Sequence, residues 1–260
     1  MGKKRASGRF ESMDDQKTII KTFTELAPRY EETVDAELSL FLGWRYQRFI
    51  ETFIKHIPLE NGDIVLDLAT GTGVIPSKLE EHGVPQDHIH GLDITYSMLK
   101  RAKSRFLENS EDFQGKLVCA SATDIPYRDK SFNIITCALA THHMDAEKLI
   151  AEIHRILQSE GIFSLADVGI TSFWQLPGIK MIARVFVFFI FLFRETLERA
   201  RAEAGAVSQA HTIEKWGELL HKNGFRDIKI TKLESKYSWI PEPYIIIARK
   251  SKGEDDDDNK

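Results

Sequence analysis

Residues 62–76 read GDIVLDLATGTGVIP, and this stretch decides the fold class. Residues 64–66 form a short aliphatic run that suits a strand buried on both faces of a parallel sheet. Asp67 ends the run, and Gly71 and Gly73 follow in a turn that opens a helix. Glycine at such a turn lets the backbone approach a ligand closely and tolerates a positive φ. The stretch therefore predicts a strand, a ligand-facing turn and a helix in succession.

Two common nucleotide-binding signatures do not fit this turn. A dinucleotide fingerprint would have a third glycine at position 76, where the chain has Pro76. A phosphate-binding loop would continue with Gly-Lys-Ser or Gly-Lys-Thr, and no such sequence follows the glycines. NAD is therefore disfavoured, and the phosphate-loop interpretation fails.

The turn resembles motif I of the class I S-adenosylmethionine-dependent methyltransferases, in which the glycine turn faces the methionine half of the cofactor. A second strand, predicted over residues 88–93, ends in Asp93, where a carboxylate can accept hydrogen bonds from ribose hydroxyls. The following residues match the family pattern Asp-x-Ser-x-x-Met-Leu-x-x-Ala, with Thr95 in the serine place. The alternative for Asp93 is a helix cap. The resemblance implies S-adenosylmethionine as cofactor and S-adenosylhomocysteine as product.

The third and fourth predicted strands resemble the family but depart from it at two acidic positions. Ser121 and Asn133 stand where the family has Asp. Adenine would instead contact the Ala122 backbone, Thr123 or Asp124. The resemblance implies a set of cofactor-binding residues at Tyr30, Asp67, Ala69, Thr70, Gly71, Gly73, Asp93, Ile94, Met98, Ser121, Ala122, Thr123 and Ala138.

The N-terminal segment is similar to that of the ubiquinone/menaquinone biosynthesis C-methyltransferases and their natural-product relatives. Residues 23–31 read FTELAPRYE, close to the family pattern Phe-x-x-Ile-Ala-x-Arg-Tyr-Asp, with Glu31 in place of Asp. Residues 138–144 read ALATHHM, where the family has Phe-Gly-Leu-Arg-Asn-Val after strand four. The resemblance covers residues 18–170 and 211–249. It implies the fold and the cofactor, and it says less about which acceptor is methylated.

The order of the blocks predicts an α/β fold. We expect a Rossmann-like class I methyltransferase sheet of seven strands, the last antiparallel, with N-terminal helices and an inserted apolar helical cap. Thr212 is the expected N-cap of the last helix, which Gly224 ends. The expected segments are a disordered basic start (1–15), an N-terminal helical cap (16–58), the cofactor-binding core (59–168), the apolar cap (169–210), the last helix and strands (211–250) and a disordered acidic tail (251–260).

Composition argues against a nucleic-acid partner. The net charge is −4, but residues 253–260 hold five acidic residues and one basic residue, and without them 34 of each remain. A balanced charge gives little attraction for a polyanion. Cys119 and Cys137 fall in strands predicted to be buried, which favours neither a disulfide nor a metal site. We find no secretory or myristoylation signal and expect a cytoplasmic protein.

Residues 181–193 contain only one polar side chain, Arg184. As a helix they would extend about 20 Å, short of the ~30 Å hydrocarbon core of a bilayer. Three interpretations remain open: a cap helix packed in the core, a wall of a hydrophobic substrate pocket, and a contact with a membrane surface or a second copy of the chain. For the pocket, we expect Trp44, Phe186 and Phe189 to contact the substrate.

His142 and His143 are the predicted catalytic residues, because they follow strand four at the edge of the sheet where ligands bind. The alternative is that they cap the next helix or pack under the lid. Adjacent residues that leave a strand should point in different directions, so at most one should face the acceptor. Tyr30 and Trp44 are the aromatic side chains expected near the sulfonium or the substrate. No metal is expected.

The predicted function is transfer of a methyl group to carbon or oxygen of a small lipophilic acceptor, quinone-, polyketide- or lipid-like. The Asn-Pro-Pro-Tyr and Pro-Cys motifs of amine and cytosine methylation do not follow strand four. Two alternatives remain: a cyclase or pericyclase of the same fold that binds S-adenosylmethionine without methyl transfer, and a non-enzymatic cofactor-binding interaction protein. For the partners of the chain, two possibilities remain open: peripheral contact with a membrane and a homodimer through the apolar cap.

Overall fold

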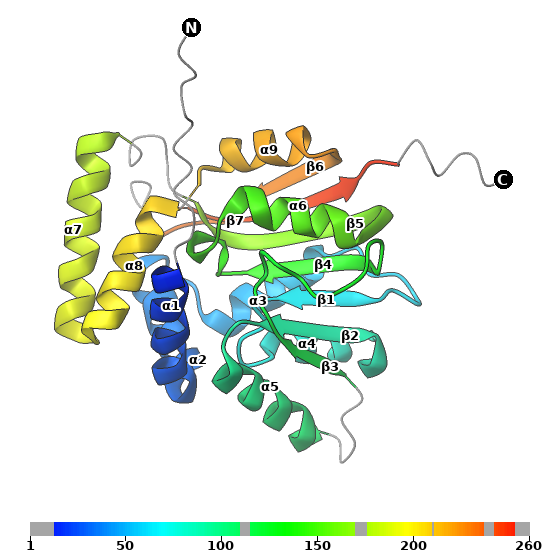
Figure 1. The fold of residues 1–260 in the computed structure, drawn as a ribbon, viewed down its shortest axis with the longest axis horizontal. Coiled ribbons are helices and arrows are strands. Elements are labelled where there is room, and N and C mark those ends of the chain that lie inside the picture. Colours follow the sequence, from blue (N-terminus) through cyan, green and yellow to red (C-terminus); the bar gives the residue numbers. More distant parts are fainter. Residues whose placement is uncertain (1–12, 110–114, 170–175, 210, 237–241, 253–260) are drawn as a thin grey trace, which may run out of the picture.

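The computed structural model describes residues 13–109, 115–169, 176–209, 211–236 and 242–252 (Figure 1). The basic start and most of the acidic tail, predicted to be disordered, lie outside these residues. The described part forms one sheet with helices on both faces and a helical cap at one end.

The central feature is a seven-stranded sheet in the order β3-β2-β1-β4-β5-β7-β6. Strands β1 to β5 are parallel, and β7 runs antiparallel to both of its neighbours. This confirms the predicted fold. The strands are β1 (Val65–Leu68), β2 (Ile89–Asp93), β3 (Lys116–Cys119), β4 (Phe132–Ala138), β5 (Leu157–Gly169), β6 (Phe225–Lys232) and β7 (Glu242–Lys250).

Two buried apolar clusters hold helices on opposite faces of the sheet. One contains side chains of α6 and α9, among them Leu149 and Trp216, and the other contains side chains of α3 and α4, among them Phe53 and Leu79. Thr212 is the N-cap of α9, as predicted, because its hydroxyl accepts a hydrogen bond from the Lys215 amide at 3.1 Å. The helices of this core are α3 (Tyr46–His56), α4 (Val74–Glu81), α5 (Tyr96–Asn109), α6 (Ala146–Ile156) and α9 (Ile213–Lys222), with 3₁₀ turns η2 (Gln86–His88) and η3 (Thr141–His143).

The cap joins segments that are far apart in the sequence. It consists of α1 (Met13–Leu26), η1 (Ala27–Arg29), α2 (Tyr30–Phe41), α7 (Pro177–Arg194) and α8 (Leu197–Gln209). In Figure 1, α7 is the outermost helix and α8 lies between it and α1. Ion pairs connect the two parts, such as Lys21 with Glu198 at 2.6 Å and Arg29 with Glu195 at 2.5 Å.

Two details differ from expectation. Helix α1 begins at Met13, before the expected boundary at residue 16. Cys119 is exposed, because β3 is an edge strand of the sheet, whereas Cys137 is buried. The prediction that both cysteines are buried is therefore wrong for Cys119. Both thiols are free. None of the helices in the described ranges combines the length and the hydropathy needed to cross a membrane.

Candidate active site

The glycine turn lies at the carboxyl end of β1, beside the end of β2. Ala69, Gly71 and Gly73 all have positive φ, at 52°, 55° and 79°. Gly71 faces a cleft and donates its amide hydrogen to Asp93 Oδ2 at 2.9 Å. Gly73 has a different role, because a Cβ there would lie 2.9 Å from Ala102 Cβ. Gly73 therefore allows close packing of α4 on α5, and it is not among the described residues that line the cleft.

Asp93 combines both interpretations of its sequence position. Its Oδ1 accepts the Thr95 amide hydrogen at 2.7 Å, and its Oδ2 accepts that of Gly71. The side chain is 8% exposed and lines the cleft, and burial raises its pKa. A carboxylate offers about four acceptor positions, so these bonds do not use all of them. Asp93 thus fixes the turn and can still accept hydrogen bonds from a ligand diol.

Two other residues predicted to bind cofactor belong to the framework beneath the cleft. Asp67 is fully buried and accepts the Thr136 hydroxyl hydrogen at 2.7 Å, and burial raises its pKa to about 7. Thr70 donates its amide hydrogen to Leu92 O at 3.0 Å. Neither residue is among the described residues that line the cleft. Their hydrogen bonds instead connect β1 with its neighbours β4 and β2.

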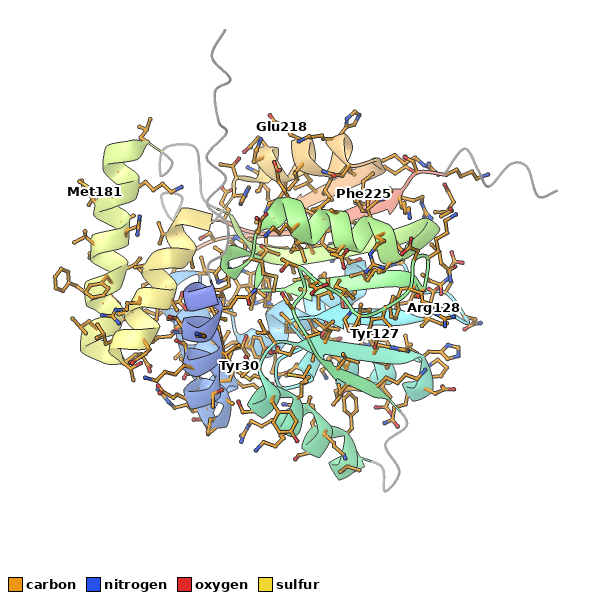
Figure 2. The ribbon with its side chains drawn as sticks, in the orientation of Figure 1. Tyr30, Tyr127, Arg128, Met181, Glu218 and Phe225 are labelled. Carbon is orange, nitrogen blue, oxygen red and sulfur yellow. The ribbon has the colours of Figure 1, made fainter. Side chains whose placement is uncertain are left out.

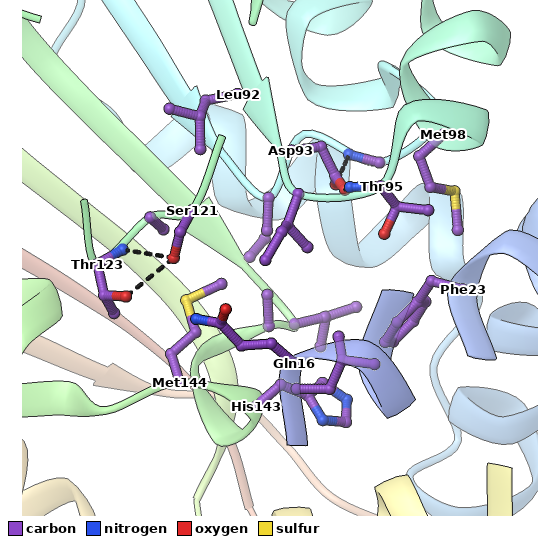
Figure 3. A pocket seen from close by; sticks show the side chains of 18 of the residues that line it. Gln16, Phe23, Leu92, Asp93, Thr95, Met98, Ser121, Thr123, His143 and Met144 are labelled. Carbon is purple, nitrogen blue, oxygen red and sulfur yellow. Dashed lines mark hydrogen bonds between the residues drawn. The ribbon is translucent and has the colours of Figure 1, made fainter. Parts of the chain in front are cut away.

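The cofactor cleft, as we call this space, has a volume of about 80 Å³ and is shown in Figure 3. The structure brings together most of the residues predicted to bind cofactor: Tyr30, Ala69, Gly71, Asp93, Ile94, Met98, Ser121, Ala122, Thr123 and Ala138. The remaining lining residues were not predicted as cofactor-binding: Gln16, Ile19, Phe23, Leu92, Thr95, Leu139, Ala140, His143 and Met144. Residues of α1 cover the cleft, and a nucleoside-sized ligand needs more than this volume, since small-molecule sites occupy roughly 300–1,000 Å³.

Ser121 and Asn133, the two departures from the family pattern, lie in different places. Ser121 borders the cleft, and its hydroxyl forms hydrogen bonds with the Thr123 hydroxyl at 2.9 Å and the Thr123 amide at 3.2 Å. Asn133 accepts the Ile64 amide hydrogen at 2.9 Å and donates to Gln158 at 3.1 Å. Asn133 thus connects β1, β4 and β5, whereas Ser121 orders a wall of the cleft.

A second, larger space, the cap cavity, lies next to the cleft and has a volume of about 520 Å³. Its walls come mainly from apolar side chains of α2, α7 and α8. The face of α7 that borders it is Ala183, Phe186, Val187, Ile190 and Phe191, which follows helical periodicity. The residues that line both the cleft and the cavity are Phe23, Tyr30, Leu139 and His143.

The predicted substrate contacts separate in the structure. Phe186 lines the cap cavity. Phe189 lies outside the group of described residues that line it and is 49% exposed. Trp44 lies elsewhere: its indole donates to Glu234 O at 2.6 Å and its ring packs on Phe49. The structure therefore gives no support to Trp44 or Phe189 as pocket residues.

His142 and His143 lie together in η3. Their ring centroids are 4.3 Å apart and both border the cap cavity, so the expectation that they point apart is wrong. The reason is local, because η3 is a 3₁₀ turn and the alternation of an extended strand does not continue into it. His142 Nδ1 lies 3.2 Å from Asp167 Oδ1. The Asp167 carboxylate also accepts the Thr141 amide hydrogen at 3.1 Å.

The two imidazoles have opposite electrostatic environments. Burial lowers the pKa of His143 well below its usual value, and the nearby His142 adds to that effect. Burial opposes the charged form of His142 too, but the Asp167 carboxylate outweighs it and raises the pKa of His142. The lowered pKa keeps His143 neutral near pH 7 and also makes it a weaker base. The pair with Glu203 brings possible metal ligands within 4.8 Å of one another, but the positive Arg199 guanidinium, 3.2 Å from Glu203, opposes a cation there.

Comparison with known proteins agrees with this geometry. A methyltransferase domain model matches residues 66–165. A demethylmenaquinone methyltransferase from Lactobacillus johnsonii is 27% identical over 224 residues, which cover 84% of this chain and 88% of that protein.

Two solved structures share the fold. Geranyl diphosphate C-methyltransferase from Streptomyces coelicolor, in complex with S-adenosylhomocysteine, has a TM-score of 0.67 at 13% identity. The superposed residues cover 92% of this chain and 99% of that protein. The cyclase SpnF has a TM-score of 0.70 at 15% identity, and the superposed residues cover 92% of this chain and 97% of the cyclase. The sheet, the glycine turn with Asp93 beside it and the matched domain together show that this chain is a class I S-adenosylmethionine-dependent methyltransferase that resembles the quinone-biosynthesis C-methyltransferases.

Proposed function

We propose that the methyl group goes to carbon or oxygen of a small lipophilic acceptor bound in the cap cavity. The observation that carries this proposal is that Phe23, Tyr30, Leu139 and His143 border both the cavity and the cofactor cleft. An acceptor in the cavity would meet the cofactor at this junction. A mainly apolar wall with a few polar groups is typical of sites for small hydrophobic ligands. The similarity to a demethylmenaquinone methyltransferase favours a quinone-like acceptor over polyketide- or lipid-like ones.

We assign the cofactor to the cleft, where the backbone at Ala69 and Gly71 allows close approach and Asp93 accepts from the ribose hydroxyls. Ile94 and Met98 give an apolar surface for adenine, beside residues 121–123. When bound, S-adenosylmethionine supplies an electrophilic methyl group on a positively charged sulfur. The chain's own contribution is then chiefly to hold two reactants in contact, for which effective molarities reach about 10⁵ M or more.

We assign the role of proton acceptor to His143 and a positioning role to His142. His143 lines both spaces and its side chain is 8% exposed, so it faces the junction rather than the solvent. Its ring packs edge-on against Phe23, with centroids 5.3 Å apart, which limits its rotation. His142 is fixed by Asp167 and packs against His143.

The test is product analysis with a short-chain prenylated naphthohydroquinone and a prenylated phenol as acceptors. Release of S-adenosylhomocysteine together with an acceptor heavier by one methyl group would support the proposal. An isomerised or cyclised product without S-adenosylhomocysteine would support the cyclase alternative. Cofactor binding without any turnover on lipophilic acceptors would favour the interaction protein and contradict the proposal.

We further propose that the outer face of α7 contacts a membrane surface, from which a lipophilic acceptor could enter. Met181, Ile182, Val185 and Phe189 are 65%, 66%, 51% and 49% exposed and follow one another at helical spacing. Phe186 is 63% exposed and also lines the cavity, so the apolar surface continues into it. Such a face is typical of helices that lie in the bilayer interface.

Vesicle co-sedimentation of the wild type and Val185→Glu tests this contact. We expect the wild type to sediment with phosphatidylglycerol-containing vesicles and the variant to bind them clearly less. The alternative occupant of the face is a second copy of the chain. A dimer in sedimentation velocity that Val185→Glu dissociates, without vesicle binding by the wild type, would replace the membrane contact by a homodimer.

A further inference from the structure

One end of the cap cavity carries charged side chains that the proposed methyl transfer does not use. Arg199 on α8 is 5% exposed, and its Nη2 lies 3.3 Å from Glu37 Oε2 and 3.2 Å from Glu203 Oε1. All three side chains line the cavity. The guanidinium also lies over the Phe23 and Phe191 rings, 5.6 and 5.4 Å from their centroids. Arg199 is thus fixed in place within an otherwise apolar wall.

The guanidinium has donors to spare. Nε and Nη1 of Arg199 are buried and have no hydrogen-bond partner, so only Nη2 is used by the two carboxylates. Buried donors that lack a partner cost free energy, and native proteins almost always supply one. Arg199 is among the residues that line the cavity of about 520 Å³, so an oxygen atom of a molecule bound there is the partner that we expect for these donors.

The surrounding charges decide which kind of oxygen fits. Glu37 and Glu203 lie 3.3 and 3.2 Å from Arg199 Nη2, so two carboxyl groups already face the single guanidinium. His142 Nδ1 lies 3.2 Å from Asp167 Oδ1, and burial lowers the pKa of His143 well below its usual value. An anionic ligand would therefore meet a carboxylate that is already paired with Arg199, and repulsion would oppose it. A hydroxyl can accept from Arg199 and donate its hydrogen to a carboxylate, without adding charge.

We propose that Arg199, with Glu37 and Glu203, is a specificity-determining site that binds a neutral hydroxyl of the acceptor and rejects carboxylates and phosphates. The inference rests on the proposed function, because it requires the acceptor to occupy the cap cavity. It assigns the orientation of the molecule: the hydroxyl lies at Arg199 and the apolar remainder lies along α2 and α7. A cation at His142, His143 and Glu203 is the less favoured use of these groups, since it would compete with Arg199 for Glu203.

The test compares three probes that differ only in their head group: para-butylphenol, para-butylbenzoate and butylbenzene, each measured by calorimetry at neutral pH. We expect the wild type to bind the phenol roughly 10- to 100-fold more tightly than butylbenzene, as for a hydrogen bond to a charged donor, and to bind the benzoate no better than butylbenzene. In Arg199→Met, the phenol should bind only as well as butylbenzene, whose own affinity should stay within about twofold of wild type.

Two further variants keep the test decisive. Arg29→Met removes an ion pair with Glu195 from the same cap, but Arg29 is not among the described residues that line the cavity, so it should retain the phenol preference. Glu37→Gln removes a negative charge beside Arg199 and should raise the affinity for the benzoate several-fold with butylbenzene unchanged. If Arg199→Met does not fold, the benzoate affinity of Glu37→Gln decides whether the inference holds.

The outcomes separate this inference from the proposed function. Tighter binding of the benzoate than of the phenol by the wild type, equal binding of all three probes, or an unchanged benzoate affinity in Glu37→Gln would overturn the inference, whether or not methyl transfer occurs. Loss of the phenol preference in Arg199→Met would support it. Should the same preparations show that preference but release no S-adenosylhomocysteine with any lipophilic acceptor, only the proposed function would fail.

Discussion

The cofactor cleft and the cap cavity border each other, but they are built in different ways. In the cleft, the Gly71 amide donates a hydrogen bond to the Asp93 carboxylate across the ends of two adjacent strands. In the cavity, the walls come from α2 and from α7 and α8, which follow α2 by more than a hundred residues, and the three helices meet through side chains (Figure 2). The Gly71–Asp93 part of the cleft is therefore encoded in a short stretch of sequence, whereas the cavity depends on how three helices pack. Mutations should affect cofactor binding and acceptor binding separately, except at the junction.

The largest effect is expected at the junction itself. His143→Ala should lower kcat by about 10²–10⁴, the usual contribution of a general base, while S-adenosylmethionine affinity changes little. Steady-state kinetics and calorimetry on one preparation measure both quantities. A near wild-type kcat would show that positioning alone carries the reaction and that His143 is not catalytic.

The pH dependence sharpens this prediction. His143 must be neutral to accept a proton, and its pKa is lowered by burial and by the neighbouring His142. The wild-type rate should therefore persist as pH falls through 6.5, the ordinary imidazole value, and decline only below it. His142→Ala removes one cause of the lowered pKa, so the acidic limb of the kcat profile should move to higher pH. An acidic limb that stays at the same pH in His142→Ala would contradict the coupling of the two histidines.

An intermediate effect is expected from Asp93→Ala, which should weaken S-adenosylmethionine binding by about 1.5–3 kcal/mol through loss of charged hydrogen bonds. The same change releases the Gly71 and Thr95 amides, so the turn also loses order. Asp63→Ala is the matched control, because Asp63 accepts a backbone amide hydrogen from Glu60 at 2.8 Å in an exposed turn far from the cleft. Equal calorimetric affinities for Asp93→Ala and wild type would remove Asp93 from the cofactor site.

The sequence predicted the parts of the site that depend on short segments. The strand that ends at Asp93, the turn at Gly71 and the N-cap Thr212 could be read because each is determined by a few neighbouring residues. The distinct role of Gly73 could not be read, since it depends on contact with Ala102 on another helix. A glycine near a ligand and a glycine near a helix look the same in a sequence.

The sequence could not determine which face of α7 borders the cavity. Nearly every side chain between residues 181 and 193 is apolar, so the hydrophobic pattern has no polar face to fix the rotation of the helix. Packing against α8 determines it in the structure. The sequence also did not reveal the Arg199 group. Glu37, Arg199 and Glu203 look like ordinary surface charges on two helices until those helices meet around the cavity.

The smallest effect is expected from a pair of single changes about one helical turn apart on α7. Phe186 lines the cavity, so Phe186→Ser should raise the acceptor KM roughly five- to tenfold, about 1 kcal/mol, because only part of a phenyl surface is removed from the contact. Phe189→Ser makes the same chemical change at a residue that is not among the described residues lining the cavity, and should leave KM within about twofold in detergent-free solution. Both variants should keep the wild-type affinity for S-adenosylmethionine, since neither residue is among those that border the cofactor cleft. Equal KM values for the two variants would mean that the cavity-lining position of Phe186 does not matter to the acceptor, and the assignment of the acceptor to a cavity assembled by three helices would then lose its support.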